Sequence, residues 1–417
     1  MPTASTDRTP TDRTVLFVGI NYAPEPTGIS PYTTGMAEGL ARRGHRVRVI
    51  TSYPHYPWWR VPDEHSALPE HSSVNGVAVT RVRHYIPRRP DNVRRALFEV
   101  SFGLRALFTR WGQPSVVVVI SPALLASRLA AFRARLQGIP VITWVQDIYT
   151  LGVGETSDGS GSRIIARVER GLTNAAARVV VIHDRFRRMF AEDVGTSSPI
   201  DVVRNWSHVP DISDAGREAT RERMGWADDE IIVLHAGAMG AKQGLENVVY
   251  AAREATRRGS RVRFVLLGDG NQREHLESLG SDPSLQFVDP LPDELFFDAL
   301  AAADVLLANE RTGLTEMSVP SKLTTYFATG LPVVAAVDAS STTHDEILAS
   351  GAGPIVPAGD PQALVDAIEA LAERPDAAAE HGAAGRAYRA AHLTPDAALD
   401  AFERTLSMAA ATDRAGG

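Results

Sequence analysis

The stretch TVLFVGINYAPEPTGISPYTTGMAEGLARRGHRVRVI, residues 14–50, decides the fold. An apolar run at 14–20 leads through a loop rich in Gly and Pro into a helical period at 30–43, and a second apolar run follows at 46–50. Gly44 closes the helix, because glycine readily adopts the left-handed conformation that ends helices. Apolar strands that alternate with helices predict a parallel sheet with helices on both faces.

The same alternation continues along the chain. Further apolar runs that we expect to form strands lie at 77–82, 116–120, 141–145, 179–182, 231–236, 263–268, 285–288, 304–308, 332–337 and 354–356. A polar stretch at 204–229 interrupts the pattern and is typical of a connection between domains. We therefore expect two doubly wound α/β domains, with the chain divided into a disordered tail at 1–13, a first domain at 14–205, a linker at 206–229, a second domain at 230–390 and a last helix with its tail at 391–417.

Composition excludes several classes of protein. Of the 417 residues 44% are apolar and 22% are charged, which is ordinary globular usage. The chain has no cysteine, so disulfide frameworks, thiolate zinc sites and cysteine nucleophiles are excluded. The tail lacks the apolar segment of a secretory signal, and the longest stretch without charge, 111–127, is too short to span a bilayer. We expect a cytoplasmic protein.

The net charge is -7, and the charged residues are unevenly distributed along the chain. Residues 1–210 carry 26 Arg against 17 acidic residues, a balance of +9, whereas residues 211–417 carry 15 Arg and 2 Lys against 33, a balance of -16. A basic half is typical of a protein that meets an anionic partner, although solvated surface charge explains it equally well.

Ligands of parallel sheets bind beyond the carboxyl ends of the strands, so the loops there are informative. The first loop, 19–30, contains Gly28, which lacks the Cβ that would keep a ligand away from the backbone. Neither GxGxxG nor GxxxxGK[ST] occurs in it, so a dinucleotide fingerprint and a P-loop are not supported there. A plain turn is the alternative.

Two loops of the second domain carry further glycines. The loop 235–244 combines Gly237 and Gly240 with Lys242, which suits a diphosphate because bare backbone stands next to a point charge. In the next loop Gly268 and Gly270 form a GxG pattern, but its third glycine position holds arginine. This incomplete fingerprint leaves a dehydrogenase as a weak alternative.

Lysine is almost absent from the chain. Of the 43 basic residues only Lys242 and Lys322 are lysines, and both lie where a strand of the second domain gives way to a helix. Ser321 is a natural N-cap, which places Lys322 in the first helical turn, where the helix dipole disfavours a cation. A bound anion would explain that placement, and two phosphate-binding lysines would explain both positions.

Residues 81–111 combine eight arginines with several aromatic and leucine side chains. A basic amphipathic helix of this kind can lie in a membrane interface and bind anionic lipid. The alternative is a surface helix that packs its apolar face on the sheet. The aromatic segment YPHYPWWR, 53–60, favours an amphiphilic acceptor, and we expect peripheral contact with an anionic membrane and no binding of nucleic acid.

The motifs together resemble a known family. They are VLFVGINYAPEPTGISPYTTGMAEGLARRGHRVRVIT, WVQDIYTLGVG, RNW at 204–206, GAMGAKQGLENVVYAA, LLGDGNQRE and VPSKLTTYFATGLPVVAA. In this order they resemble the family 4 (group 1) glycosyltransferases of the GT-B fold, in the branch that builds O-antigen, colanic acid and capsule. The resemblance implies two Rossmann-like domains that face a cleft, with a last helix that returns to the first domain. It also implies a nucleotide-sugar donor, held mostly by the second domain, and retaining transfer without a metal ion.

The resemblance also implies site residues. The donor diphosphate is held in the family by the loop matched here by 237–244 and by a helix N-terminus matched by Ser321 and Lys322. Many members carry two glutamates eight residues apart, where this chain has Met317 and Thr325. Glu310 and Glu316 are the acids considered for the sugar, and Glu316 is assigned to the donor. The strand-exit residues Gly28, Gly237, Gly240, Gly268, Gly270 and Ser321 are assigned to the donor as well.

We expect a retaining glycosyltransferase that uses Lys242 and Lys322 to stabilise the leaving nucleotide diphosphate. Asp147, an acid at a strand exit of the first domain, is assigned to orient the acceptor hydroxyl, and a helix N-cap is its alternative role. The acceptor is expected to be lipid-linked or a glycan. A nucleotide-sugar epimerase of the same fold and a non-catalytic nucleotide-sugar-binding partner remain the alternative functions.

Overall fold

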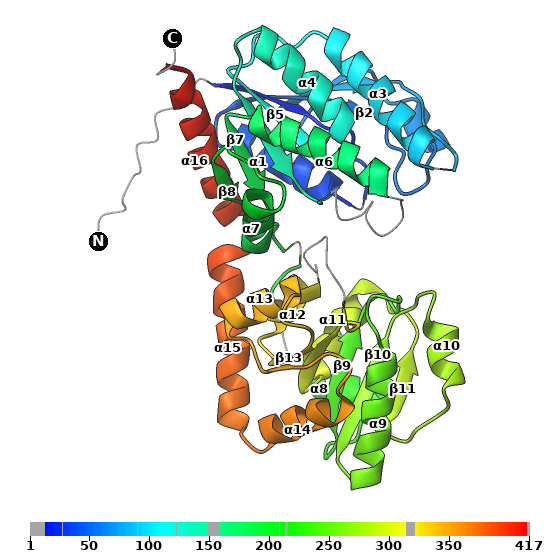
Figure 1. The fold of residues 1–417 in the computed structure, drawn as a ribbon. Coiled ribbons are helices and arrows are strands. Elements are labelled where there is room, and N and C mark those ends of the chain that lie inside the picture. Colours follow the sequence, from blue (N-terminus) through cyan, green and yellow to red (C-terminus); the bar gives the residue numbers. More distant parts are fainter. Residues whose placement is uncertain are drawn as a thin grey trace. The chain divides into compact units, whose positions relative to one another are not determined.

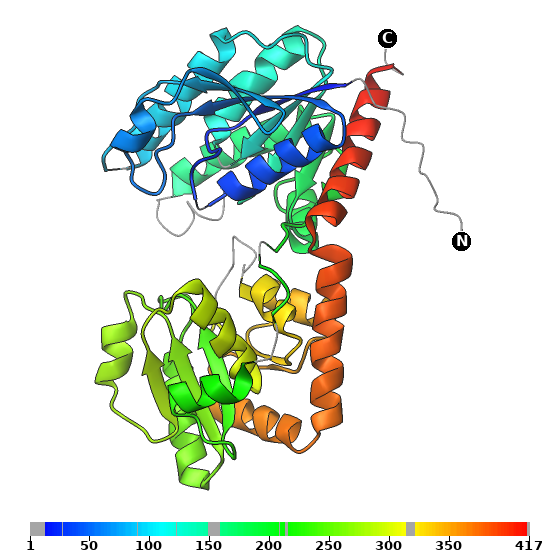
Figure 2. The same ribbon diagram turned by 180° about the vertical axis from the view of Figure 1, so that it is seen from behind.

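The computed structural model describes residues 13–26, 28–89, 91–121, 123–148, 159–207, 209–212, 216–313 and 322–414. The chain folds into two compact units (Figures 1 and 2). Unit 1 comprises Met1–Asn205 together with Pro395–Gly417, and unit 2 comprises Trp206–Thr394. The stretch expected as a linker thus belongs to unit 2 from Trp206 onward, and residues 391–394 also lie in that unit.

Unit 1 is built on one sheet, which has eight strands within the described residues, in the order β3-β4-β2-β1-β5-β6-β7-β8. All neighbouring strands are parallel except β3 and β4, which are antiparallel. The strands are β1 (Thr14–Val18), β2 (Arg46–Ser52), β3 (His71–Val74), β4 (Val77–Val82), β5 (Val116–Ser121), β6 (Val141–Val145), β7 (Arg178–Val181) and β8 (Ile200–Val202). Central strands are mostly apolar because helices cover both faces, and every residue of β5 and β6 is buried.

The helices of unit 1 follow the strands in sequence. They are α1 (Ser30–Arg42), α2 (Asp63–Ser66), α3 (Asn92–Phe108), α4 (Leu124–Leu136), α6 (Gly159–Asn174), α7 (Asp184–Glu192) and, from the end of the chain, α16 (Pro395–Arg414). The side chain of Asp91 caps α3 by accepting a hydrogen bond from the backbone N–H of Arg94 at 2.8 Å. α3 packs on α4 (Figure 1).

Helix α16 is held to the rest of unit 1 by both apolar and charged contacts. The ring of Phe402 stacks on Phe17 with centroids 6.0 Å apart and lies 5.2 Å from the ring of Trp144. The guanidinium of Arg43, at the end of α1, pairs with Asp400 at 2.6 Å and with Glu403 at 2.9 Å. The last helix of the chain therefore completes the core of the unit that contains the first strand.

Unit 2 contains a fully parallel sheet, which has six strands in the part of the chain that the structure describes, in the order β11-β10-β9-β12-β13-β14. The strands are β9 (Ile231–Ala236), β10 (Val262–Leu267), β11 (Leu285–Val288), β12 (Val305–Asn309), β13 (Val333–Ala336) and β14 (Ile355–Val356). The helices are α8 (Arg217–Met224), α9 (Glu246–Arg258), α10 (Arg273–Ser278), α11 (Asp293–Ala302), α12 (Lys322–Thr329), α13 (Thr342–Ser350), α14 (Pro361–Ala372) and α15 (Pro375–His392). Along β9, Ile232 and Leu234 belong to one core cluster and Val233 to the other, so both faces of the sheet are buried.

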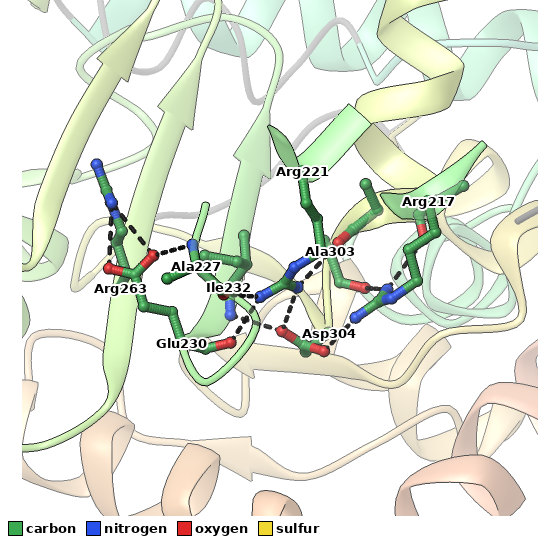
Figure 3. Close-up of polar contacts among 10 residues, drawn as sticks. Arg217, Arg221, Ala227, Glu230, Ile232, Arg263, Ala303 and Asp304 are labelled. Carbon is green, nitrogen blue, oxygen red and sulfur yellow. Dashed lines mark hydrogen bonds and ion pairs between the residues drawn. The ribbon is translucent and has the colours of Figure 1, made fainter. Parts of the chain in front are cut away.

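A polar network fastens α8 to the amino edge of this sheet (Figure 3). Asp304 accepts hydrogen bonds from the guanidinium groups of Arg217 at 2.5 Å and Arg221 at 3.1 Å, and from the backbone N–H of Ile232 at 2.7 Å. Arg221 is buried and also donates to the carbonyls of Ala227 and Glu230. The network ties the segment that enters unit 2 to the beginning of β9 and β12.

Candidate active site

The loop that follows β9 lies against the loop that follows β10, backbone to backbone. The N–H of Gly237 donates to the carbonyl of Leu267, and that of Met239 donates to the carbonyl of Asp269, both at 2.9 Å. A Cβ on Gly268 would lie 2.1 Å from the carbonyl oxygen of Gly237, and one on Gly270 would lie 2.4 Å from that of Met239. Glycine at 268 and 270 is therefore required by loop packing, whether or not these residues also touch a ligand.

Lys242 is exposed on the β9 loop, and the loop is anchored around it. The Lys242 carbonyl accepts a hydrogen bond from the N–H of Arg311 at 2.9 Å. The side-chain amide of Asn309, buried at the end of β12, donates to the carbonyls of Gln243 at 2.7 Å and Gly244 at 3.0 Å. The sequence did not predict this role of Asn309. Its only signal is that it is a polar residue at the end of an apolar strand.

The side chain of Gln243 closes the same loop from within. Its Oε1 accepts a hydrogen bond from the N–H of Gly240 at 3.0 Å. Gly237 has a φ of +124°, and a Cβ there would meet no atom within 4 Å. The backbone conformation of Gly237, and not crowding, therefore favours glycine at this position.

Lys322 begins α12, and its Nζ lies 3.5 Å from Nε2 of His235 in β9. His235 has no exposed surface, and burial, reinforced by the Lys322 charge, lowers its pKa well below the usual value. The imidazole is therefore neutral near pH 7 and able to accept a hydrogen bond from the ammonium group. The sequence contained His235 at the start of a glycine loop, but nothing in it indicated this contact.

Of the two acids that follow the apolar part of β12, Glu310 lies within the described residues and Glu316 does not. Glu316 and Ser321, both expected at the donor site, lie outside the described residues. Glu310 at the end of β12 is buried, and its carboxylate accepts hydrogen bonds from the hydroxyls of Ser341, at 2.5 Å, and Thr343. Because the side chain of Ser341 also caps α13, the carboxylate of Glu310 stabilises the beginning of that helix.

Gly28 and Asp147 lie in unit 1, also beyond the carboxyl ends of strands. Gly28 has a φ of +69°, and a Cβ there would lie 3.3 Å from the ring of Tyr56. Asp147 is half-buried just after β6, next to the buried Gln146, whose Oε1 accepts a hydrogen bond from Asn205 at 2.9 Å. The structure thus places these two residues in one unit and both lysines, with Gly237, Gly240, Gly268 and Gly270, in the other.

Among the described ranges, no group of three or more His, Asp or Glu side chains is arranged to hold a metal ion. Within the same ranges, no helix combines the length and the apolar character that crossing a membrane requires.

Comparison with protein families gives two matches along the chain. Residues 27–206 match the model described as glycosyl transferase 4-like domain, and residues 230–374 match that of glycosyl transferases group 1. A putative colanic acid biosynthesis glycosyl transferase of Escherichia coli is 31% identical over 335 residues, which are 76% of this chain and 81% of the relative. A probable glycosyltransferase of Pseudomonas aeruginosa is 24% identical over 262 residues, 61% of this chain and 64% of the relative.

Solved structures share the architecture. Sucrose-phosphate synthase from Thermosynechococcus elongatus superposes with a TM-score of 0.70 at 17% identity, over 96% of this chain and 100% of that one. The Anabaena protein HepE in complex with UDP-glucose has a TM-score of 0.65 at 16% identity, over 95% and 99%. The fold is GT-B, as the sequence predicts, with two doubly wound units whose sheets are parallel except for the β3–β4 pair.

Proposed function

Because the chain belongs to the group 1 glycosyl transferases, we propose that it moves a sugar from a nucleotide-diphosphate sugar to a lipid-linked or glycan acceptor, with retention at the anomeric carbon. Its enzyme class is glycosyltransferase, related to enzymes of polysaccharide biosynthesis. Solved structures of the Anabaena protein HepE, which shares the fold, hold UDP and UDP-glucose, which supports a nucleotide-sugar donor. Such transfer in the cytoplasm would serve the cell envelope.

The observation that carries the proposal is the positive charge at the carboxyl edge of the unit 2 sheet. Lys242 lies on the β9 loop and Lys322 at the start of α12, where backbone N–H groups and the helix dipole also favour an anion. Transfer breaks the bond between the anomeric carbon and the diphosphate, so negative charge grows on the leaving group. Preorganised cations there lower the barrier.

The remaining steps need few groups from the protein. With retention, the acceptor hydroxyl attacks the face that the diphosphate leaves, and a phosphate oxygen of the leaving group accepts the hydroxyl proton. No protein nucleophile is required, in contrast to retaining glycosidases with their carboxylate pair. Asp147 would orient the acceptor hydroxyl. The donor charge is balanced by lysines in this scheme, so we propose that catalysis does not depend on a metal ion.

Peripheral contact with an anionic membrane is the second part of the proposal, and α3 supports it. Phe98 and Phe102 on this helix pack in the core of unit 1, whereas Leu97 and Phe108 are exposed, Phe108 to 84%. The amphipathic pattern at 81–111 thus contains two apolar sets, one that packs on the sheet and one that faces solvent.

The neighbouring helix α4 extends this surface. Phe132 and Leu136 are exposed there, Leu136 to 72%, and α4 contains arginines but no acidic residue. The only acid of α3, Glu99, is buried and accepts a hydrogen bond from the N–H of Leu125 at 2.9 Å. Exposed apolar side chains on two helices that carry more arginines than acidic residues are complementary to an anionic lipid surface, which the inner face of the cytoplasmic membrane provides.

A product assay tests the transfer. Purified protein is incubated with UDP-, GDP-, ADP- and dTDP-sugars and a membrane-lipid extract, and nucleotide release and acceptor mass are measured. Free nucleoside diphosphate with a lengthened acceptor supports the proposal. An isomerised donor would identify an epimerase, and thermal stabilisation by donors without turnover would identify a non-catalytic partner.

Two further measurements test the remaining parts. Turnover is expected to survive EDTA, and a loss restored by magnesium or manganese would refute metal independence. Protein is expected to sediment with anionic vesicles and to be released as salt rises. Replacing Phe108 and Leu136 by Ser should weaken sedimentation, whereas Leu348→Ser, the same loss of an exposed apolar side chain in unit 2, should not.

A further inference from the structure

The buried carboxylate of Glu25 joins two loops at the carboxyl edge of the unit 1 sheet. Glu25 lies in the loop after β1, and its Oε1 accepts hydrogen bonds from the backbone N–H groups of His55, at 2.7 Å, and Tyr56, at 3.0 Å, in the segment after β2. Its Oε2 accepts from the side-chain amide of Asn21 at 2.8 Å. Nδ1 of His55 lies 3.0 Å from Oε1 as well. One carboxylate therefore satisfies donors from both loops.

Other buried groups hold the same region. Arg81 is buried and donates to the carbonyl of Ala23 at 3.1 Å, and the N–H of Ala23 donates to the hydroxyl of Thr34 at 3.0 Å. Nδ1 of His55 is also 3.0 Å from the carbonyl of Tyr53. Buried or partly buried hydrogen bonds thus hold both the loop after β1 and the segment after β2, which makes them costly to break.

This rigid segment presents aromatic rings to solvent. Tyr56 is 37% exposed and Trp58 is 41% exposed, whereas Trp59 packs its ring against Phe98 with centroids 5.7 Å apart. Tyr56 also lies beside Gly28, where the missing side chain leaves its ring accessible from the first loop. Tyr56 and Trp58 thus expose ring surface on a segment whose backbone is held at the edge of the sheet where ligands of parallel sheets bind.

We propose that Tyr56 and Trp58 form a stacking platform for a sugar ring of the acceptor, and that Glu25 is the positioning residue that holds this platform against the loop after β1. The platform rests on the proposed function, because it names an acceptor subsite for glycosyl transfer. A pyranose ring has an apolar C–H face edged by hydroxyl groups, and tyrosine and tryptophan match it with an apolar face and a polar tip. Stacking also needs preorganised rings, which an adaptable lipid surface does not require.

Direct binding tests the platform without a known acceptor. Methyl glycosides of the common hexoses, 6-deoxyhexoses and N-acetylhexosamines are screened against the full chain by saturation-transfer NMR with irradiation of aromatic protons. At least one glycoside should receive saturation on its ring C–H protons. Tyr56→Ala and Trp58→Ala should each weaken that binding about tenfold, the effect of losing one aromatic contact. Absence of saturation transfer from the whole panel would overturn the proposal.

The role of Glu25 is tested by Glu25→Gln, because an amide offers one acceptor and one donor edge where the carboxylate offers two acceptor edges. We expect weaker glycoside binding or a raised KM for the acceptor, with an unchanged Kd for UDP. Glu38→Gln is the matched control, since Glu38 accepts one hydrogen bond from Asn75. If Glu25→Gln does not fold, the two aromatic variants still decide the question.

Two outcomes distinguish the acceptor platform from the proposed glycosyl transfer and from membrane contact. A wild-type protein that binds glycosides but transfers no sugar would refute the proposed function and leave the platform standing. If Tyr56→Ala and Trp58→Ala lose vesicle sedimentation but keep full glycoside binding, the rings are lipid contacts and the platform is refuted.

Discussion

Nζ of Lys322 lies 3.5 Å from Nε2 of His235, and the histidine is completely buried. Burial and the lysine charge both lower the His235 pKa, so the neutral ring accepts a hydrogen bond from the ammonium group. The contact joins the beginning of α12 to β9, the strand whose exit loop carries Lys242. The buried His235 thereby holds Lys322 at the carboxyl edge of the unit 2 sheet, the same edge at which Lys242, the other lysine of the chain, is exposed.

The first prediction concerns these lysines. Lys242→Ala and Lys322→Ala should each lower kcat about 100- to 1000-fold, as expected when one preorganised donor to a developing charge is removed. Lysine to arginine should restore activity only in part, because a planar fork replaces a compact charge. Steady-state kinetics measure the effect on kcat. The affinities for UDP and UMP are measured as well, and we expect the larger loss of affinity for UDP, the diphosphate.

Arg257→Ala provides the control for charge removal, since Arg257 pairs on the surface with Glu254. Its turnover should equal that of the wild type. Normal turnover in both lysine variants would show that neither lysine stabilises the leaving group.

The second prediction is a loss of stability in mild acid. Burial, together with the charge of His55, lowers the pKa of His84 to about 3, against about 6.5 in the unfolded chain. Between these values the unfolded state binds a proton that the folded state does not, so stability is complete above pH 6.5 and falls as the pH decreases. The loss for His84 should reach about 2 kcal/mol at pH 5.

Urea unfolding at pH 7 and pH 5 measures this effect. His84→Gln should flatten the pH dependence of unit 1, and His235 acts in the same direction in unit 2 because its pKa is also lowered. His275→Gln, at a half-exposed histidine next to Glu246, should retain the full dependence. An unchanged slope in His84→Gln would contradict the assignment.

The third prediction tests the network at the amino edge of the unit 2 sheet. Asp304→Asn removes the charge that faces Arg217 and the buried Arg221, so we expect a loss of about 2–3 kcal/mol, limited because Arg221 keeps backbone carbonyl partners. Asp366→Asn breaks the pair of an exposed carboxylate with Arg258 and should leave the Tm almost unchanged. Equal Tm shifts in the two variants would show that the network contributes no more than a surface pair.

The architecture could be predicted because it depends on a long-range pattern. Strands buried on both faces must be mostly apolar: the first five residues of β5 are apolar, and so are four of the five residues of β6. The edge strands β3 and β8 were missed for the converse reason. Every second residue of β3 is exposed and β8 has no fully buried residue, so HSSV and IDV need no apolar run.

The contacts within the site could not be predicted, because they join residues distant in sequence. Asn309 holds a loop more than sixty residues earlier, and Glu25 holds a segment thirty residues later. The same limit affected α3, because the sequence indicates an amphipathic helix within 81–111 but not that Phe98 lies in the core and Phe108 is exposed. Spacing shows that a helix is amphipathic but not which apolar residues a neighbouring element covers.

The last prediction separates packing from ligand contact at the glycine loops, which composition alone cannot do. An alanine Cβ at Gly268 would lie 2.1 Å from the carbonyl oxygen of Gly237, at a φ of +134°. At Gly259, φ is +67° and a Cβ would meet nothing within 4 Å, so Gly259→Ala measures the backbone strain alone, about 1–2 kcal/mol. Gly268→Ala should lower the Tm clearly more, because the β9 and β10 loops must move apart. UDP binding should then weaken together with stability. If Gly268→Ala melts like Gly259→Ala but loses UDP binding, the glycine serves the donor directly and the packing explanation is wrong.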